Sequence, residues 1–417
     1  MIKRTQFAKL QAHLSKKEIT LIIGPRQIGK STLMELLREG LEKKGEKTTF
    51  LSMDFDEHKP FFDSQAKLLQ YIKLQIGEKQ GYVFLDEIQR KENAGLFLKG
   101  LYDMHLPYKF IVSGSGSLEL KENIHESLSG RKRVFEIAPV SFVEFVNFKT
   151  DYKYEDTLQE FFSLYSERTK LLLEEYMMFG GYPRVILAET ADEKREVMGE
   201  IYQSYLERDI KDLLKLEKTD AFVNLVRIMA SQIGGLTNFS ELSSTLGLAE
   251  ITVKRYLWYM EKTFIVRKIT PFHRNLRSEI TKSPMYYFYD VGLRNYALGA
   301  FGFPIVSLTS GHLFENIICS ILHDTMRFTS TTVHFWRTAD HAEVDFIIQR
   351  GTQPLPIEVK YTALKKPELT RSFRSFLIKY KPQAAYIIHI GEKLEKEVEG
   401  TRVSLIPYYQ LLSLELG

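Results

Sequence analysis

The chain has 417 residues, with 44% hydrophobic side chains, 26% charged side chains and a formal net charge of +4. This length predicts two or three domains, and the composition excludes a disordered or fibrous protein. The single cysteine, Cys319, excludes an internal disulfide, and no Cys/His cluster indicates a structural zinc. The sequence has no apolar run typical of a signal peptide and no stretch of about eighteen apolar residues that would span a membrane. We therefore expect a cytoplasmic protein without a membrane partner.

Short apolar runs alternate with amphipathic helical stretches from Glu18 to about Ile137. The runs are ITLIIG, TTFLSMD, GYVFLDE and KFIVSG, and each ends near Gly, Asp or Ser, where a strand meets a loop. This alternation predicts an α/β fold in which helices wrap a parallel sheet.

The first run leads into GPRQIGKST, which fits the phosphate-loop pattern G-x-x-x-x-G-K-[ST] between a strand and a helix. Two glycines at fixed positions let the backbone turn and present N–H groups to phosphate. Lys30 would reach the β- and γ-phosphates of ATP, and Ser31 would place its hydroxyl on Mg²⁺. The predicted ATP-binding residues of this loop are Gly24, Pro25, Arg26, Gln27, Ile28, Gly29, Lys30, Ser31 and Thr32.

Hydrolysis also needs a metal ligand and a base, and GYVFLDEIQR offers both. Asp86 lies at the carboxyl end of a predicted central strand, where it would hold Mg²⁺ through water. Glu87 would polarise the attacking water as general base. The alternative is a buried strand that ends in a solvated acid pair.

Two further segments offer catalytic candidates. KFIVSGSGS ends a strand at Ser113, whose hydroxyl would lie near the γ-phosphate. SLSGRKRVFEI contains Arg131 and Arg133, and Arg131 would serve, in cis or in trans, as a finger that stabilises transition-state charge. The alternative is a pair of solvated basic residues before a strand.

The motifs GPRQIGKST, FLDEIQR, SGSGS, LSGR with FEIAPVSFVEF, GGYPRV and YLERDI together resemble a set found in one family. This family comprises AAA-type ATPases of bacteria and archaea whose C-terminal half is a domain of unknown function. SPMYYFYDVGLRNY, GHLFENII, WRTADHAEVDFII and PIEVKY resemble it as well, so the resemblance runs from about Lys16 to Tyr361.

This resemblance implies a helical lid at whose base Pro183, in Gly-Tyr-Pro, lies near the nucleotide. A plain loop breaker between helices is the alternative. Arg208 and Asp209 in YLERDI share the family pattern without an assigned chemistry, and a helix salt bridge or cap would explain them equally well.

The segment LTNFSELSSTLGLAEITVKRYLWYMEKTFIVRKITPF is typical of a winged helix. Gly247 would end its first helix, and Ile251, Val253, Tyr256, Leu257 and Met260 suit the second. Eight Lys/Arg and two Glu between Ile251 and Lys282 give this segment a charge of +6, an electrostatic footprint for DNA. The alternative is a module that packs on its own ATPase domain or on a partner.

Acidic residues and a lysine recur in the C-terminal region. Glu315 lies in the helical stretch GHLFENIICSIL, and Asp345 lies in the strand-like EVDFII. Glu358 and Lys360 are two positions apart in LPIEVKY, so their side chains share one face of a strand. This set resembles the PD-(D/E)xK nuclease core, with Asp345 and Glu358 as metal ligands, Lys360 as the motif lysine and Glu315 as the helix acid. The alternatives are a decayed nuclease fold used for binding or assembly, and a simple salt bridge.

The combined prediction is an α/β protein with four units. They are a P-loop AAA-type ATPase domain at 1–150, a helical lid and linker at 151–217, a winged-helix module at 218–300, and a restriction-endonuclease-like α/β domain at 301–417. The protein would bind and hydrolyse ATP with Mg²⁺, act on or near DNA, and be compatible with a homo-oligomer. The alternative is an ATP-dependent switch or interaction protein whose C-terminal modules bind a partner.

Overall fold

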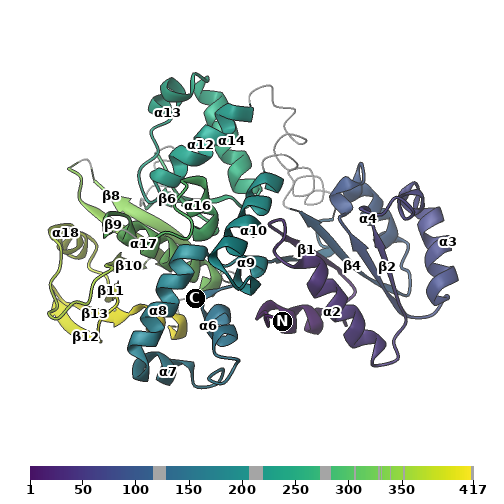
Figure 1. Cartoon of the computed structure of the whole chain (residues 1–417), viewed down its shortest axis with the longest axis horizontal. Helices are drawn as coiled ribbons and strands as arrows, with labels where there is room; N and C mark the ends of the chain where they lie inside the picture. Colours follow the sequence, from purple (N-terminus) through teal and green to yellow (C-terminus); the bar gives the residue numbers. More distant parts are fainter. Residues whose placement is uncertain are drawn as a thin grey trace.

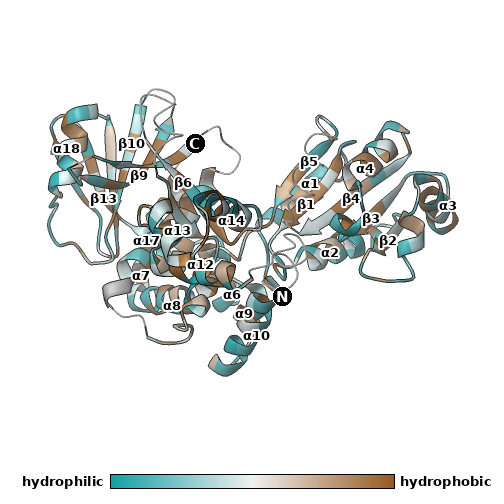
Figure 2. Ribbon diagram, turned by 90° about the horizontal axis from the view of Figure 1, so that it is seen from above, coloured by the Kyte–Doolittle hydropathy of each residue, from teal (hydrophilic) through white to brown (hydrophobic). Residues whose placement is uncertain are grey.

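The computed structural model describes residues 1–115, 128–205, 219–272, 283–304, 307–326, 329, 331–338, 340–350 and 353–414. These residues form two lobes (Figures 1 and 2). We call residues 1–137 the N-terminal lobe and residues 138–414 the C-terminal lobe. No helix within the described ranges is long and apolar enough to cross a membrane.

The N-terminal lobe is built on a five-stranded parallel sheet in the order β2-β3-β4-β1-β5. The residues of β1, β3 and β4 are all buried, as expected of a parallel sheet covered on both faces. The predicted parallel sheet is therefore confirmed. Its elements are α1 (Gln6–His13), β1 (Ile19–Gly24), α2 (Lys30–Glu42), β2 (Thr48–Ser52), η1 (Lys59–Phe62), α3 (Gln65–Ile76), β3 (Gly81–Asp86), η2 (Ile88–Arg90), α4 (Ala94–Asp103), β4 (Tyr108–Ser115) and β5 (Lys132–Glu136).

In the described range 138–205, five helices follow the sheet and begin the C-terminal lobe. Ser141 and Thr190 each close a capping box at a helix start. One helix ends at Gly180 with φ 76°, and the next begins with Pro183 at its first turn, so the Gly-Gly-Tyr-Pro segment interrupts the helices. The helices are α6 (Phe142–Lys149), α7 (Leu158–Leu164), α8 (Ser166–Phe179), α9 (Pro183–Leu187) and α10 (Ala191–Ser204).

The rest of the C-terminal lobe combines helices with an eight-stranded mixed sheet in the order β12-β13-β11-β10-β9-β8-β6-β7. Strands β6 and β8 pair in parallel through Thr270 and His334, so the predicted units 218–300 and 301–417 share one sheet. The elements are α12 (Thr219–Ser231), α13 (Phe239–Leu246), α14 (Glu250–Lys262), β6 (Val266–Pro271), β7 (Met285–Phe288), α16 (Val291–Ala297), α17 (Ser307–Met326), β8 (Thr332–Arg337), β9 (Glu343–Arg350), β10 (Gln353–Val359), α18 (Arg371–Tyr380), β11 (Ala384–His389), β12 (Leu394–Val398), β13 (Thr401–Pro407) and η4 (Tyr408–Ser413).

The helix pair α13–α14 lies where the sequence places two helices. Gly247, at φ 60°, ends α13 as predicted. All five apolar residues named for the second helix lie in α14. The side chains of Val253, Tyr256 and Leu257 are buried, whereas Ile251 is 73% exposed and lies off the apolar stripe of the helix.

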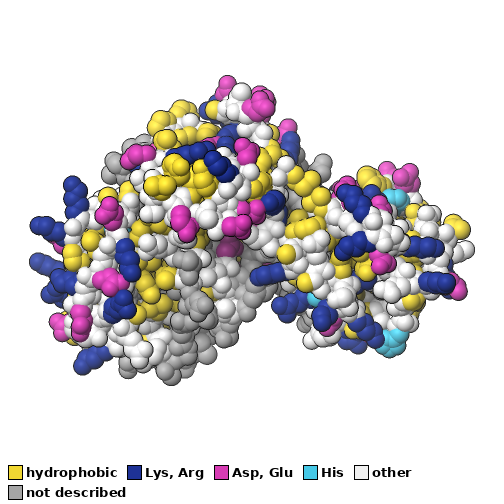
Figure 3. Space-filling model, turned by 90° about the horizontal axis from the view of Figure 1, so that it is seen from below, with side chains coloured by type: hydrophobic (Ala, Val, Ile, Leu, Met, Phe, Trp, Pro, Cys, Tyr) yellow, Lys and Arg dark blue, Asp and Glu magenta, His cyan; other side chains and the backbone are white. Residues whose placement is uncertain are grey.

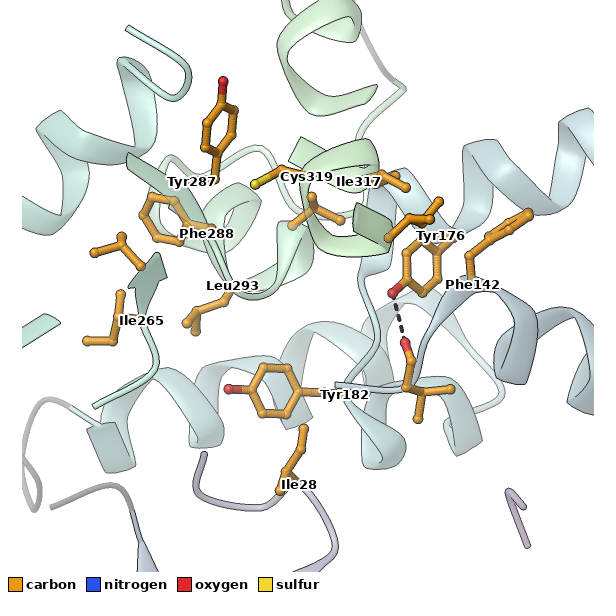
Figure 4. Packing of buried hydrophobic residues seen from close by; sticks show 14 of the residues in the cluster. Ile28, Phe142, Tyr176, Tyr182, Ile265, Tyr287, Phe288, Leu293, Ile317 and Cys319 are labelled. Carbon is orange, nitrogen blue, oxygen red and sulfur yellow. Dashed lines mark hydrogen bonds between the residues drawn. The ribbon is translucent and has the colours of Figure 1, made fainter. Parts of the chain in front are cut away.

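A continuous hydrophobic core joins the two lobes. It extends from Ile28 in the phosphate loop through the helices of the C-terminal lobe to α16, α17 and the mixed sheet. Figure 4 shows the Tyr182 side chain above Ile28 and below Leu293 of α16. A second cluster fills the other face of the parallel sheet, and a third lies between the mixed sheet and α18. The lobes are therefore packed against each other through the face of the sheet that carries α1 and α2.

The Phe142 side chain tests this core. Its ring lies 6.0 Å from Phe162, 5.6 Å from Tyr176 and 5.6 Å from Tyr408, measured between centroids. Phe142→Ala should lower the free energy of unfolding by about 3–5 kcal/mol, because it leaves a cavity among these rings. Phe303→Ala is the control, since Phe303 is 58% exposed and should change stability by about 0.5 kcal/mol or less. Equal midpoints for both variants in urea denaturation would contradict the packing described.

Candidate active site

The phosphate loop connects the carboxyl end of β1 to the start of α2. Gly24 has φ 155°, and a Cβ atom there would lie 2.3 Å from the Ile137 carbonyl oxygen, so only glycine fits. Gly29, at φ 93°, turns the chain into α2. The first N–H groups of α2 therefore open toward the loop, where the helix N-terminus favours an anion.

Lys30 and Ser31 begin α2 and lie within reach of the predicted catalytic strand ends. Lys30 is 5% exposed, and its Nζ donates hydrogen bonds to the carbonyl oxygens of Gly24 at 3.1 Å and Pro25 at 2.7 Å. The Ser31 hydroxyl donates to Asp86 Oδ2 at 2.9 Å. The two predicted Mg²⁺ ligands, Ser31 and Asp86, are thus adjacent. Their hydroxyl and carboxylate oxygens suit Mg²⁺, because this ion prefers oxygen ligands and keeps several bound waters.

Asp86, Glu87 and Ser113 meet at the carboxyl ends of β3 and β4. The Ser113 hydroxyl donates a hydrogen bond to Asp86 Oδ1 and accepts one from the Glu87 backbone N–H at 3.2 Å. Glu87 has φ 54°, a left-handed conformation that is strained for a non-glycine residue and common at functional sites. The Gln89 side-chain amide donates to Glu87 Oε2, a contact that the sequence motif did not predict.

A cavity of about 430 Å³ lies over the loop, which is the size range of small-molecule sites. Pro183 lines it, as predicted from the resemblance, and so does Glu87. Several other residues that line the cavity were not predicted from the sequence. The lining is Met1, Ile2, Arg4, Arg26, Gln27, Ile28, Gly29, Lys30, Ser31, Thr32, Leu33, Leu36, Glu87, Pro183, Arg184, Leu187 and Ser204.

Two arginines among the missed residues contact the loop directly. Arg4 is almost buried, pairs with Glu144 at 3.1 Å, and donates to the Ile28 carbonyl oxygen at 3.3 Å. Arg184 donates to the Gln27 side-chain oxygen at 2.6 Å. The only sequence signal for Arg184 was its position beside Pro183, and no motif marked Arg4.

Arg131 lies at the opposite edge of the parallel sheet. Its carbonyl accepts from the Ile19 N–H at the amino end of β1, and its guanidinium pairs with Asp103 at 2.8 Å. The phosphate loop follows the carboxyl end of the same strand, about 16 Å away at the usual rise per residue. The predicted finger role in cis is therefore wrong, and the role in trans stays a prediction.

The predicted acidic cluster of the C-terminal lobe does come together. Strands β9 and β10 are antiparallel with Phe346 opposite Ile357, which places Asp345 across from Glu358 on one face. Asp345 Oδ2 accepts from the Val359 N–H at 2.7 Å, and Lys360 Nζ pairs with Glu358 at 2.8 Å.

Glu315 approaches this cluster from α17, where its carboxylate accepts from the Tyr287 hydroxyl. Burial raises the pKa of Asp345 well above its usual value, and the charges of Glu315 and Glu358 raise it further. Among the residues that the structure describes, however, no group of three or more His, Cys, Asp or Glu side chains is arranged to hold a metal ion. The predicted metal role of Asp345 and Glu358 thus gains no support from this geometry.

Three basic residues of the helix pair and wing, Lys254, Arg255 and Arg267, differ in exposure. Lys254 and Arg255 lie on the outer face of α14. Arg267 on β6 is partly buried, and its guanidinium lies 4.2 Å from the centre of the Tyr289 ring. Arg267 therefore belongs to the lobe interior. Residues 273–282, which include Arg274, Arg277 and Lys282, lie outside the described residues, as do Arg208 and Asp209.

Three family matches divide the chain. Residues 16–146 match a family described as AAA domain, residues 170–303 match Domain of unknown function (DUF8612), and residues 310–411 match Domain of unknown function (DUF4143). The first match, together with the strand order and the phosphate loop, defines the N-terminal lobe as an AAA-type P-loop ATPase domain.

Relatives along most of the chain are themselves uncharacterized proteins. One from Mycobacterium tuberculosis is 26% identical over 393 residues, which are 94% of this chain and 80% of the relative. One from Haemophilus influenzae is 26% identical and covers 92% of each chain, and one from Methanocaldococcus jannaschii is 25% identical over 74% of this chain and 68% of its own.

Two solved structures are similar to part of this chain. The replication initiator DnaA, bound to AMPPCP and single-stranded DNA, is 15% identical over 63% of this chain and 90% of its own, with a TM-score of 0.32. Cdc6p from Pyrobaculum aerophilum is 10% identical over 75% of this chain and 93% of its own, with a TM-score of 0.30. Scores of this size carry no functional argument.

Asp345 provides a prediction about pH. Its pKa is raised in the folded state above the value of about 3.9 in an unfolded chain, so the folded state binds the proton more tightly. The contribution of Asp345 to the free energy of unfolding should therefore be largest below about pH 4 and fall as pH rises above it. Asp345→Asn should flatten this decline, because the amide does not ionise.

Urea denaturation between mildly acidic and neutral pH would measure the effect. Asp340→Asn is the control, because Asp340 is exposed and its variant should keep the wild-type profile. Parallel profiles for Asp345→Asn and the wild type would contradict the electrostatic description of the cluster.

Proposed function

We propose that the protein is a Mg²⁺-dependent ATPase whose catalytic residues are Lys30, Asp86 and Glu87. The observation that carries this proposal is the meeting of Ser31 and Ser113 on the Asp86 carboxylate, next to Glu87 and at the wall of the loop cavity. A phosphate loop alone would bind a nucleotide, whereas a metal-ligand pair beside a candidate base also supports hydrolysis.

Each residue of the site has a separate task in this proposal. Lys30, now bonded to loop carbonyl oxygens, would turn to the β- and γ-phosphates. Ser31 and Asp86 would hold Mg²⁺, which neutralises phosphate charge when bound. Ser113 orients the Asp86 carboxylate and the Glu87 backbone, and Glu87 would accept a proton from the attacking water.

The lid adds one group that could contact phosphate. Arg184 lines the cavity and is held by Gln27 of the loop and by Glu200 at 2.9 Å. When ATP binds, the Arg184 guanidinium would donate to phosphate oxygens in place of the side-chain oxygens of Gln27 and Glu200.

Two variants separate binding from hydrolysis. Lys30→Ala should weaken ATP binding tenfold or more, which is about 1.4 kcal/mol or above, because it removes the cation from the phosphates. Glu87→Gln should keep ATP affinity and lower the rate of phosphate release by about 10²–10⁴-fold, since only the base is lost. Titration with a fluorescent ATP analogue and a phosphate-release assay would measure both quantities.

Glu92→Gln serves as the matched control, because Glu92 is exposed and outside the cavity. Wild-type turnover in Glu87→Gln would refute its role as base. A wild-type protein that hydrolyses no ATP with Mg²⁺ present would refute the proposed activity itself.

A second function, binding of DNA, is favoured by the outer face of α14. The helices α13 and α14 followed by the hairpin β6–β7 are the arrangement expected of a winged helix, and Lys254 and Arg255 face outward from α14. On the face drawn in Figure 3, Lys and Arg are interspersed with Asp and Glu. The alternative function is an ATP-dependent switch that retains ATP. This alternative predicts slow ATP hydrolysis that is not stimulated by DNA.

Charge reversal tests the α14 surface. Lys254→Glu with Arg255→Glu should weaken DNA binding and make its salt dependence shallower by about one unit for each phosphate that the variant no longer neutralises. Lys43→Glu with Lys44→Glu is the control, because these exposed lysines follow α2 on the other lobe. Identical salt slopes for the α14 double variant and the wild type would favour a packing role for the module.

For the C-terminal acidic cluster we propose a nuclease-like fold used for binding or assembly. The proposal is supported by the position of Asp345 across from Glu358 on adjacent antiparallel strands, with Lys360 paired to Glu358 at 2.8 Å.

A further inference from the structure

Three polar side chains of α16 and its cap are almost completely buried inside the C-terminal lobe. Asp290, Arg294 and Asn295 are 3%, 4% and 3% exposed, although each carries several polar atoms. Buried groups of this kind are costly unless they are hydrogen-bonded, so their partners show which segments they hold.

The Asp290 carboxylate binds two segments that are far apart in the sequence. One oxygen accepts from the Leu293 N–H at 2.8 Å and caps α16, and the other accepts from the Gly181 N–H at 2.6 Å. Burial raises the pKa of Asp290 to about 6, and the N–H groups of Gly181, Leu293 and Gly292 oppose this rise. At neutral pH the carboxylate is therefore ionised and depends on these donors.

The contact leaves no room for larger side chains on either segment. A Cβ atom on Gly180 would lie 2.4 Å from Asp290 Oδ1, and one on Gly292 would lie 2.1 Å from the Phe179 carbonyl oxygen. A Cβ atom on Gly181 would lie 2.4 Å from the Val140 carbonyl oxygen. The end of α8 and the start of α16 therefore meet backbone to backbone.

The neighbouring residues strengthen the contact with α8 and extend it to one further helix, α12. The Asn295 side-chain amide donates to the carbonyl oxygens of Met177 at 2.9 Å and Met178 at 3.0 Å, which end α8. Arg294 Nε donates to the Ala230 carbonyl oxygen at 2.7 Å, which lies near the end of α12. Helix α16 thus joins α8 of the lid to the first helix of the predicted DNA-binding module.

Gly181 leads directly to the nucleotide cavity. The next residue, Tyr182, packs between Ile28 of the phosphate loop and Leu293 of α16 (Figure 4). Pro183 and Arg184 follow and line the cavity. The position of these wall residues therefore depends on how Gly181 is held.

We propose that Asp290 is a positioning residue for the nucleotide site, through which the C-terminal lobe sets the affinity for ATP. This inference rests on the proposed ATP binding at residues 24–32 and adds a means of regulation. Because binding free energies are reciprocal, a partner that moves α12 and α16 would change ATP affinity, and ATP would change the affinity for that partner by the same factor.

The isosteric variant Asp290→Asn tests the proposal. It replaces one acceptor oxygen by an NH₂ group, which repels whichever N–H it faces, and it leaves the volume unchanged. We expect kcat/KM for ATP to fall by about tenfold to a hundredfold, because a small displacement of a wall residue is enough for such a loss. The Kd of a fluorescent ATP analogue should rise in parallel, measured where circular dichroism shows a folded protein.

Asn238→Ala is the matched control, because it removes a helix N-cap in the same lobe and away from the cavity. If Asp290→Asn does not fold, Asn295→Ser takes its place, since it removes the bonds to Met177 and Met178 and should raise the Kd in the same direction. Affinity and turnover that match the control would overturn the inference and reduce Asp290 to a helix cap. A wild-type protein that binds no nucleotide would overturn the proposed function and this inference together.

Discussion

The Asp290 carboxylate is the constraint on which the nucleotide cavity depends. It is buried inside the C-terminal lobe and must find hydrogen-bond donors there, because a bare ionised carboxylate in such a place is costly. Two of its donors belong to α16 and one belongs to Gly181. The glycines at 180, 181 and 292 allow the close approach that these bonds require. The segment that forms one wall of the cavity is thus fixed from outside the ATPase domain.

The opposite wall is fixed within the ATPase domain by a second close contact. Gly24 lies against the Ile137 carbonyl oxygen, and this contact sets the position of the phosphate loop beside β5. The carboxyl ends of β3 and β4 then bring Asp86 and Ser113 next to Ser31. Together the two contacts place the proposed catalytic groups of the N-terminal lobe opposite Pro183 and Arg184 of the C-terminal lobe.

The parts that the sequence predicted correctly follow from local patterns and from one rule of sheet topology. The parallel sheet and the phosphate loop follow from motifs in which strand, glycine and polar residue are near neighbours. Ser31 and Asp86 lie 55 residues apart, and their grouping was predictable because the carboxyl ends of parallel strands meet at the same end of the sheet. The pairing of Asp345 with Glu358 was also within reach, because few residues separate their strands. Arg131 was misplaced since spacing does not tell at which end of a sheet a residue lies. Arg4 and Arg184 escaped notice because they bind residues of the other lobe, and Asp290 because its partner Gly181 is 109 residues away.

Hydrogen exchange of single amides tests the central claim most directly, that the C-terminal lobe completes the nucleotide site. The amides of Gly181 and Leu293 share the Asp290 carboxylate, so they should open together. In the Glu87→Gln variant, which should retain ATP, addition of ATP with Mg²⁺ should slow the exchange of both amides along with those of the phosphate loop. Slower exchange in the phosphate loop with unchanged rates at Gly181 and Leu293 would contradict the account.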